Sequence, residues 1–413
     1  MRMDTVIMGG GLSGLTCGIA LAKRGQRVTI VAGGQSTLLL NGGSMDLLGC
    51  IDGKAVTNPI EAIATLPESH PYRKIGADNI ADLADEAKQL LEDAGIGMTG
   101  NANANHWRIT PMGVAKPAWL TLDKNLRIDS LDSLPCKRLA LMCVRGFFDV
   151  PNSMLANGLR EIGFEVDVKE FTTDDITALR RSPSEMRATS LSKRLTSNNA
   201  LQRIADQINS LAADADMVVL PSVLADEDAA TTLQTMLHKP LRLIATLPPS
   251  VPGMRIQTLL RHYFRMLGGN YLMGDTATSA AFDGDRLTSV TTAKLGDMPL
   301  KADNFVLATG SFISRGLVAD YERVYEPIMG LDMDSDGDRE HWTRFGVLEP
   351  QDYMNYGVAT DNELHAILNR KPVTNLRVIG SILSGHDAVK MGDGTGVSLL
   401  TALAAAKSIL AQR

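Results

Sequence analysis

The sequence of 413 residues predicts an α/β fold in which a parallel sheet is interrupted by an inserted α/β middle domain. The first supporting observation is a strand, a glycine turn, a helix and a second strand within residues 4–31. The second is a series of short strands and glycine-rich turns from residue 253 onward, closed by a long apolar helix. We therefore assign 1–48 and 253–413 to one discontinuous domain and 49–252 to the insert, where the pattern differs.

The amino-terminal turn carries the pattern G-x-G-x-x-G between a short apolar strand and a helix. The first glycine permits a tight turn, the second lets backbone approach a phosphate, and the third allows close helix packing. Because a helix amino terminus attracts anions, this context predicts a Rossmann-like site for a nucleotide-type cofactor rather than a turn that only packs. The residues of the turn that we expect to contact the cofactor are Gly9, Gly10, Gly11, Ser13 and Gly14.

The remaining elements follow in chain order. Helices are expected over 80–95, 153–162, 255–267 and 397–410, where apolar residues recur at helical spacing. Strands are expected over 138–144, 164–168, 217–220 and 241–246, and another over 303–311 stops on a turn of small residues. The strand–helix–strand unit at 138–168 lacks the three-glycine turn, so we do not assign a second dinucleotide site to it.

Composition excludes several classes of protein. A net charge of −6, without a basic stripe, argues against nucleic-acid binding and against direct docking on an anionic membrane. No apolar run approaches the ~18 residues that a membrane span needs. The amino terminus lacks signal-peptide anatomy, which predicts a cytoplasmic protein whose membrane contact comes through a partner. The four cysteines and seven histidines have no metal-ligand spacing, so no metal site is expected.

Later segments supply more of the small residues that close cofactor approach requires. Residues 41–44 could bring backbone N–H groups and a hydroxyl to a ring or phosphate, or form an ordinary surface turn before a helix. The glycines of 392–396 open the last helix, where its amino terminus can stabilise negative charge or serve as a plain cap. The further residues that we expect to contact the cofactor are Gly42, Gly43, Ser44, Thr309, Gly310, Gly380, Ser381, Gly394 and Gly396.

The order of these motifs resembles the two-dinucleotide-binding-domain flavoproteins of the fumarate reductase and glycerol-3-phosphate dehydrogenase kind. The matching segments are the first glycine turn, 306–310, 375–380 and 392–396. The whole chain, including 247–257, is similar to the B-subunit family of anaerobic glycerol-3-phosphate dehydrogenases.

The resemblance implies a flavoprotein subunit that oxidises sn-glycerol 3-phosphate to dihydroxyacetone phosphate. It implies that electrons pass to quinone, and ultimately to fumarate or nitrate, through partner subunits. The implied partners are a catalytic flavoprotein (the A subunit) and an iron–sulfur protein (the C subunit) that anchors the complex at the inner face of the cell membrane. A helix amino terminus at 392–396 would then raise the electron affinity of the flavin ring.

One departure from the usual FAD pattern bears on the cofactor. An acidic residue normally ends the second strand and binds the adenosine ribose, but here that position holds Ala32, followed by Gly33 and Gly34. A methyl group accepts no hydrogen bond, so one interpretation is that the adenosine half is absent and the cofactor is FMN. The family resemblance also implies FMN. The alternative is FAD held by the backbone of Gly33 and Gly34 and by Gln35 or Ser36.

Substrate chemistry requires cations for a phosphate and a base for the hydroxyl proton. Arg255 is a candidate because it lies in the first turn of the expected 255–267 helix, where a cation is electrostatically disfavoured. Arg187 is a second candidate cation, and His386, which follows 380–385, is a candidate base. The competing interpretation, which the sequence favours for each residue taken singly, is a solvated arginine or a loop histidine without a catalytic role.

Three other functions stay open. The chain could bind flavin and only relay electrons between partner subunits, which the lack of a clear acid/base constellation favours. It could be a fumarate reductase-like flavin oxidoreductase with another substrate. A pyridine-nucleotide dehydrogenase is disfavoured, because no second G-x-G-x-x-G exists and the 392–396 pattern has no role there.

Overall fold

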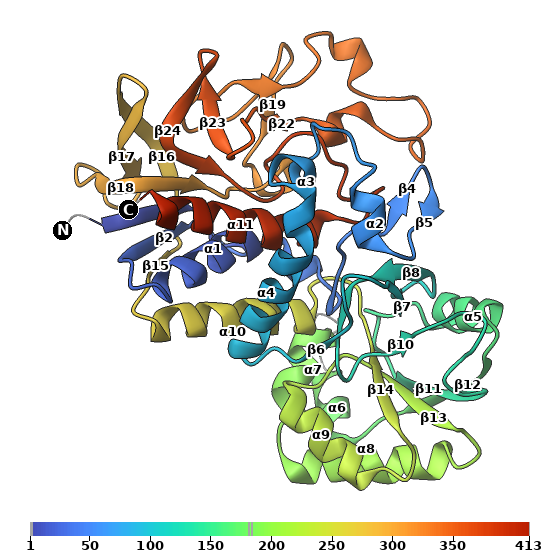
Figure 1. Ribbon diagram of the computed structural model, residues 1–413. Coiled ribbons are helices and arrows are strands. Elements are labelled where there is room, and N and C mark those ends of the chain that lie inside the picture. The colour runs from blue at the N-terminus through green and yellow to red at the C-terminus, as the bar shows by residue number, and fades with distance from the viewer. Residues whose placement is uncertain (1–2, 181, 183–184, 413) are drawn as a thin grey trace.

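The computed structural model describes residues 3–180, 182 and 185–412. Its main body contains an eight-stranded sheet with a parallel centre (Figure 1). In spatial order the strands are β15 (Asn270–Met273), β2 (Val28–Ala32), β1 (Met3–Met8), β18 (Leu300–Leu307), β17 (Arg286–Thr292) and β16 (Ala277–Asp283), with β24 (Lys371–Val378) beside the end of β18 and β23 (His365–Leu368) beside β24. Met8 lies opposite Val31 on one side and Leu307 on the other, so three parallel strands end at one edge.

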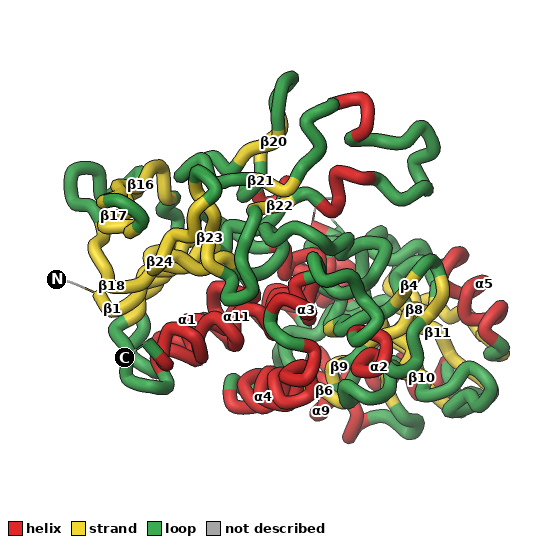
Figure 2. The backbone as a smooth tube through the Cα atoms, turned by 45° about the horizontal axis from the view of Figure 1, so that its top comes forward, coloured by secondary structure: helices red, strands yellow, loops and turns green. Residues whose placement is uncertain are grey.

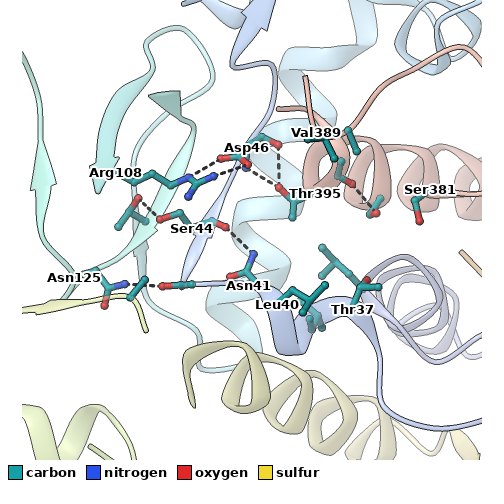
Figure 3. A pocket seen from close by; sticks show the side chains of 18 of the residues that line it. Thr37, Leu40, Asn41, Ser44, Asp46, Arg108, Asn125, Ser381, Val389 and Thr395 are labelled. Atoms are coloured by element: carbon teal, nitrogen blue, oxygen red, sulfur yellow. Dashed lines mark hydrogen bonds and ion pairs between the residues drawn. The ribbon is translucent and has the colours of Figure 1, made fainter. Parts of the chain in front are cut away.

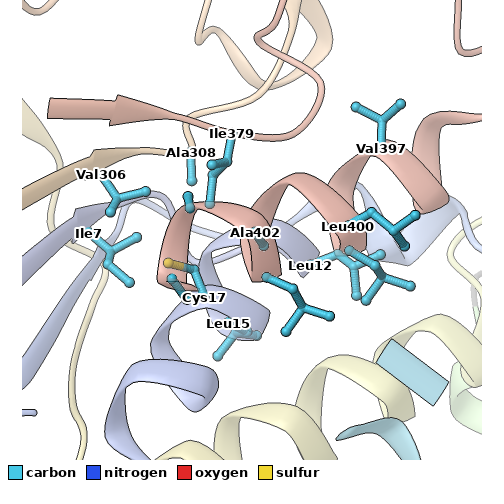
Figure 4. Packing of buried hydrophobic residues seen from close by; sticks show 14 of the residues in the cluster. Ile7, Leu12, Leu15, Cys17, Val306, Ala308, Ile379, Val397, Leu400 and Ala402 are labelled. Carbon is cyan, nitrogen blue, oxygen red and sulfur yellow. The ribbon is translucent and has the colours of Figure 1, made fainter. Parts of the chain in front are cut away.

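Helices with buried apolar faces cover this sheet. They are α1 (Leu12–Ala22), α10 (Val251–Met266) and α11 (Gly394–Ala411), with α4 (Ile80–Asp93) against α11 and two short helices, α2 (Pro59–Ile63) and α3 (Pro71–Lys74), nearby. Figure 4 shows α11 lying across α1, with Leu400 and Leu12 between them. Both side chains are buried in one hydrophobic cluster with Ile7 and Val306 of the sheet, because each strand under the helices is apolar on that face.

The insert has its own four-stranded parallel sheet and its own hydrophobic cluster, and Figure 1 shows it as a second lobe beside the main body. Its strands in order are β12 (Glu165–Phe171), β11 (Arg138–Val144), β13 (Met217–Pro221) and β14 (Leu241–Ile244). Its helices are α5 (Asn152–Ile162), α6 (Asp174–Leu179), α7 (Ala188–Arg194), α8 (Asn198–Leu211) and α9 (Glu227–Met236). The α/β fold class predicted from the sequence is therefore confirmed.

Small antiparallel sheets are formed by segments within residues 44–128. One is β3 (Ser44–Met45), β9 (Leu120–Leu122) and β6 (Met98–Thr99), another is β10 (Arg127–Ile128), β7 (His106–Ile109) and β8 (Ala115–Ala118), and the third pairs β4 (Cys50–Ile51) with β5 (Lys54–Ala55). Through β3 and β9, Ser44 of the main body lies opposite Thr121. The buried side chains of α4 belong to the main cluster, although α4 lies within residues 49–252. The domain boundary near residue 48 stays a prediction.

The helix expected over 255–267 begins four residues earlier, at Val251. Ser250 caps it by accepting a hydrogen bond from the backbone N–H of Gly253 at 3.3 Å, and Pro252 occupies the first turn, where proline is favoured. The proline-rich sequence before it favours a loop, which is why the sequence pattern alone misplaces this start. Arg255 therefore lies beyond the first turn, and the helix-dipole reason for choosing it is wrong.

Residues 312–357 are mostly loop, and Figure 2 shows them projecting from the main body beyond β20 (Val324–Tyr325) and β21 (Met333–Asp334). These strands pair with β19 (Val318–Ala319) and β22 (Gly357–Val358) respectively. Among the described helices, α11 has the length and apolar composition of a membrane span. It packs on α1 and α4 with ten buried residues, as the central helix of a folded domain does.

Candidate functional site

A cavity of about 430 Å³ lies where the parallel strands of the main body end and the insert begins (Figure 3). One wall comes from the starts of α1 and α11 and from the turns after β18 and β24, and the other from β7, β9 and β14. Ligands of open α/β sheets bind at this carboxyl edge. The polar and charged lining residues that matter most for the chemistry are Asn41, Ser44, Asp46, Arg108, Ser381 and Thr395.

The glycine turn has the steric features expected of its first and third glycines. Gly9 has a φ of +118°, and a Cβ there would overlap the carbonyl of Ala308. A Cβ on Gly14 would overlap the carbonyl of Gly9, so α1 begins in direct contact with the turn. The space beside Gly11 is open, since the nearest atom to a Cβ there is Cβ of Ser36 at 3.5 Å. Among the described residues no side chain caps α1, which leaves its first N–H groups available to an anion.

The end of β2 differs from that of a typical ribose site. Ala32 is buried, and its carbonyl accepts the backbone N–H groups of Gly274 and Asp275 at 2.7 and 3.2 Å. The carboxylate of Asp275 stands close by but is occupied. It accepts hydrogen bonds from the hydroxyl of Thr292 at 2.6 Å and from the backbone N–H groups of Thr276 and Lys294. Asp275 therefore does not replace the missing acid.

The turns after β18 and β24 have features that fit a flat ligand. The hydroxyl of Thr309 is buried without a hydrogen-bond partner among the described residues, so a bound group could satisfy it. Gly310 and Gly380 have φ values of +82° and +76°. Gly380 lies against Ser13, because a Cβ there would come within 2.5 Å of the Ser13 hydroxyl. Together with the open N–H groups of α1, these residues fit a phosphate-bearing ring cofactor.

The start of α11 is tied to the segment after β3. The backbone N–H of Asp46 donates to the hydroxyl of Thr395 at 2.6 Å, and that hydroxyl donates to the carbonyl of Asp46 at 3.0 Å. Gly394 lines the cavity, as do Gly42, Ser44 and Ser381 of the expected contact residues. Gly396 lies instead against Tyr72, whose hydroxyl would overlap a Cβ at that position.

Sequence reasoning missed the charged pair in the cavity. Nε of Arg108 lies 3.2 Å from Oδ1 of Asp46, and Figure 3 shows the two side chains pointing toward each other across the boundary between the lobes. Within the described part of the chain, these two are the charged side chains that line the cavity. Burial raises the pKa of Asp46, although the neighbouring Arg108 lowers it in part. No spacing pattern links residues 46 and 108, so only the Asp46 position, just after 42–44, offered a clue.

A second set of polar contacts in the cavity region joins β3, β9 and β7. The hydroxyl of Thr121 lies 2.9 Å from that of Ser44 and 2.7 Å from Nε2 of His106. Burial, with a smaller contribution from Arg127, lowers the pKa of His106 to about 4, so this histidine is neutral at pH 7. Thr121 therefore links β3 to β7 at the edge of the cavity.

His386 is held behind the cavity rather than in its lining. Its Nδ1 lies 3.1 Å from the buried carboxylate of Asp393, the residue before α11. Nε2 of His70 lies 3.0 Å from the other oxygen of that carboxylate. Nδ1 of His70 accepts the backbone N–H of Tyr72 at 3.1 Å, so in the neutral ring the proton is on Nε2.

The two candidate arginines lie outside the cavity lining. Arg255 pairs with Glu227 at 3.4 Å. Arg187 pairs with the buried Asp149 at 2.8 Å and donates to the carbonyl of Pro248 at 3.0 Å. Their surroundings are those of ion pairs within and beside the insert, and a role in substrate binding stays a prediction for both.

Comparison with known proteins gives consistent results. Residues 4–397 match the family described as FAD binding domain. The chain is 40% identical to the B subunit of anaerobic glycerol-3-phosphate dehydrogenase from Yersinia enterocolitica, over 99% of this chain and 98% of that protein. It is 38% identical to the protein of the same name in Yersinia pseudotuberculosis, over 100% and 99%. A solved 3-ketosteroid delta1-dehydrogenase from Sterolibacterium denitrificans covers 100% of both chains with a TM-score of 0.46 and 11% identity.

Proposed function

Since the chain belongs to the family of anaerobic glycerol-3-phosphate dehydrogenase B subunits, and to that of the FAD binding domain, we propose that it is a flavin-dependent subunit that oxidises sn-glycerol 3-phosphate to dihydroxyacetone phosphate. Electrons then pass to quinone, and ultimately to fumarate or nitrate, through the catalytic flavoprotein A subunit and the iron–sulfur, membrane-anchoring C subunit. The complex is cytoplasmic and peripheral to the membrane. The observation that carries the proposal is one cavity that joins the carboxyl edge of the parallel sheet, two helix amino termini and an Asp–Arg pair.

The flavin phosphate is assigned to the first N–H groups of α1, beside the open space at Gly11. The ring is assigned to the part of the cavity lined by Ser311 and Ser381, next to Thr309 and Gly310 in the chain and facing the start of α11. When bound, a flavin accepts a hydride from the substrate carbon. The positive end of α11, at Gly394, favours negative charge on the nearby edge of the ring.

Two residues of this chain are suited to handle the substrate. Arg108 can hold an anionic group, and Asp46 can accept the hydroxyl proton, because burial raises the pKa of its carboxyl group. Thr395 fixes the backbone of Asp46 through two hydrogen bonds. A phosphate that draws Arg108 away from Asp46 would leave this carboxylate free to act as a base.

We propose FMN as the flavin. The matched family is named for FAD, and this name does not favour the smaller cofactor. The support comes from the end of β2, where Ala32 offers no acceptor side chain and the nearby carboxylate of Asp275 is occupied by three donors. The alternative is FAD held by the backbone of Gly33 and Gly34. Chromatography of the cofactor released from the purified chain distinguishes the two, and release of FAD would refute the FMN proposal alone.

A second candidate function, electron relay without substrate oxidation, is favoured by the charges in the cavity. The single guanidinium lining it, among described residues, is already paired with Asp46, so a phosphate dianion meets no uncompensated cation. The isolated chain should be mixed anaerobically with glycerol 3-phosphate while the flavin absorbance is followed. Bleaching supports oxidation by this chain and refutes pure relay. Bleaching only in the presence of the partner subunits supports relay.

The same assay covers the remaining alternatives. A fumarate reductase-like oxidoreductase with another substrate predicts no bleaching by glycerol 3-phosphate with or without partners, and re-oxidation of chemically reduced flavin by a dicarboxylate. A pyridine-nucleotide dehydrogenase predicts bleaching by NADH alone.

A further inference from the structure

Five large apolar side chains, two of which line the cavity, are exposed and form what we call the apolar rim: Ile313, Phe345, Val347, Leu348 and Val389. Their exposed fractions are 70%, 109%, 86%, 84% and 64%, far above those of the buried core. Scattered single apolar residues are normal at a protein surface, but a contiguous group marks a contact site.

Three segments bring these residues together. The amine of Lys390, next to Val389, donates to the carbonyl of Leu348. The ring of Phe312, next to Ile313, packs edge-on against Tyr353 at 5.9 Å between centroids. The backbone N–H of Tyr353 donates to the carbonyl of Trp342 at 3.0 Å. The loop that carries Phe345 therefore contacts the segments of Ile313 and Val389.

The apolar rim is continuous with the cavity. Ile313 and Val389 also line it, and Figure 3 shows Val389 beside the start of α11. Whatever covers the rim therefore lies at the mouth of the space to which we assign the flavin ring. This position suits a macromolecule that exchanges electrons with that ring.

The segment that carries three of the rim residues is acidic, which limits the kind of partner. Residues 332–352 contain seven Asp or Glu and two Arg side chains. Two copies of this surface, placed face to face, would bring their carboxylates together, and an anionic lipid surface would be repelled as well. A partner surface with an apolar patch bordered by Lys or Arg would be complementary to the rim in hydrophobicity and in charge.

We propose that the apolar rim docks a partner subunit of the same enzyme, which carries its own redox centre and presents an apolar patch bordered by basic residues. This inference rests on the proposed function, because it requires a flavin in the cavity and a multi-subunit enzyme. It assigns electron exit to the face formed by Ile313, Val389 and the 345–348 loop.

The test is co-purification of the full complex with variants of this chain. The double variant F345Q/L348Q removes two exposed apolar side chains that do not line the cavity, and F148Q is the matched control, since Phe148 is 75% exposed on the insert. We expect F345Q/L348Q to weaken partner binding at least about tenfold, whereas F148Q does not. The charge reversal E349K should also weaken binding, most strongly at low salt. Unchanged binding of F345Q/L348Q would overturn the proposal.

The flavin content and the midpoint of thermal unfolding should be measured for each isolated variant, to show that the substitutions leave the fold intact. Both should equal those of the wild type, because the substituted side chains are exposed. A chain that holds no flavin would refute the proposed function while partner binding could still be measured. Two further results would overturn the docking proposal: a wild-type homodimer that F345Q/L348Q dissociates, or wild-type binding to phosphatidylglycerol-containing vesicles that F345Q/L348Q abolishes.

Discussion

Nδ1 of His386 lies 3.1 Å from the fully buried carboxylate of Asp393, and His70 binds the other oxygen of the same group. Burial alone would raise the pKa of Asp393, but His386 and His70 lower it well below its usual range. The carboxylate thus stays ionised and fixes the segment that leads into α11. His386, a candidate base from the sequence, lies outside the cavity lining with its Nδ1 against Asp393, and its role as a base stays a prediction.

Replacing Asp393 by Asn should lower the free energy of unfolding by about 1–3 kcal/mol. Nε2 of His70 is a fixed donor and would take the amide oxygen, so the amide NH₂ would face Nδ1 of His386 and force the proton of that ring onto Nε2. Urea unfolding measures the loss, and nitrogen NMR of the histidines detects the tautomer. The control is D336N, at an exposed Asp paired with His341 at 2.9 Å, which should change stability by less than about 0.5 kcal/mol.

Acidification should destabilise the protein through His106. The folded-state pKa of about 4 is below the unfolded value of about 6.5, so the unfolded chain binds the proton first. The contribution of His106 to the free energy of unfolding is therefore fully present above pH 6.5. It is lost as pH falls from 6.5 toward 4, by about 1–3 kcal/mol. H106Q, which keeps a hydrogen-bonding group beside Thr121, should flatten this part of the pH profile of unfolding. An unchanged slope in H106Q would assign the acid sensitivity to other groups.

Replacing Gly9 by Ala should abolish flavin binding and destabilise the chain by about 1–3 kcal/mol. The added methyl group meets the carbonyl of Ala308 at a residue with a φ of +118°. G337A is the control, because no atom lies within 4 Å of a Cβ there and Gly337 lies outside the segments assigned to the flavin. Flavin absorbance per protein and the thermal midpoint should separate the two variants, and equal flavin content would contradict the assignment of this turn.

If this chain oxidises the substrate, D46N should slow flavin reduction by roughly 10²–10⁴-fold. The wild-type rate should fall as pH drops through the raised pKa of Asp46, since only the ionised carboxylate accepts the proton. In D46N this acid limb should disappear from the stopped-flow profile. A D46N variant with a normal rate and an intact acid limb would exclude Asp46 as the base.

Local patterns predicted the parts of the fold that depend on neighbouring residues. The apolar run before Gly9, the helix from Leu12 and the strand Arg138–Val144 appear where the sequence indicated, and the family resemblance is confirmed over nearly the full length. The Asp46–Arg108 pair was not predictable, because it forms when β3 pairs with β9 and β7 lies alongside, 62 residues further along the chain. Arg255 was misjudged because a proline-rich helix start resembles a loop.

The cavity is bounded by two hydrophobic cores that have separate sheets. A ligand that contacts both walls is therefore bound fully only when both lobes are folded, and its binding energy couples two folding units that have separate cores. Without the ligand, calorimetry should resolve separate melting of the insert. With the ligand bound, the two transitions should merge at a higher temperature, because the cofactor then stabilises both lobes together.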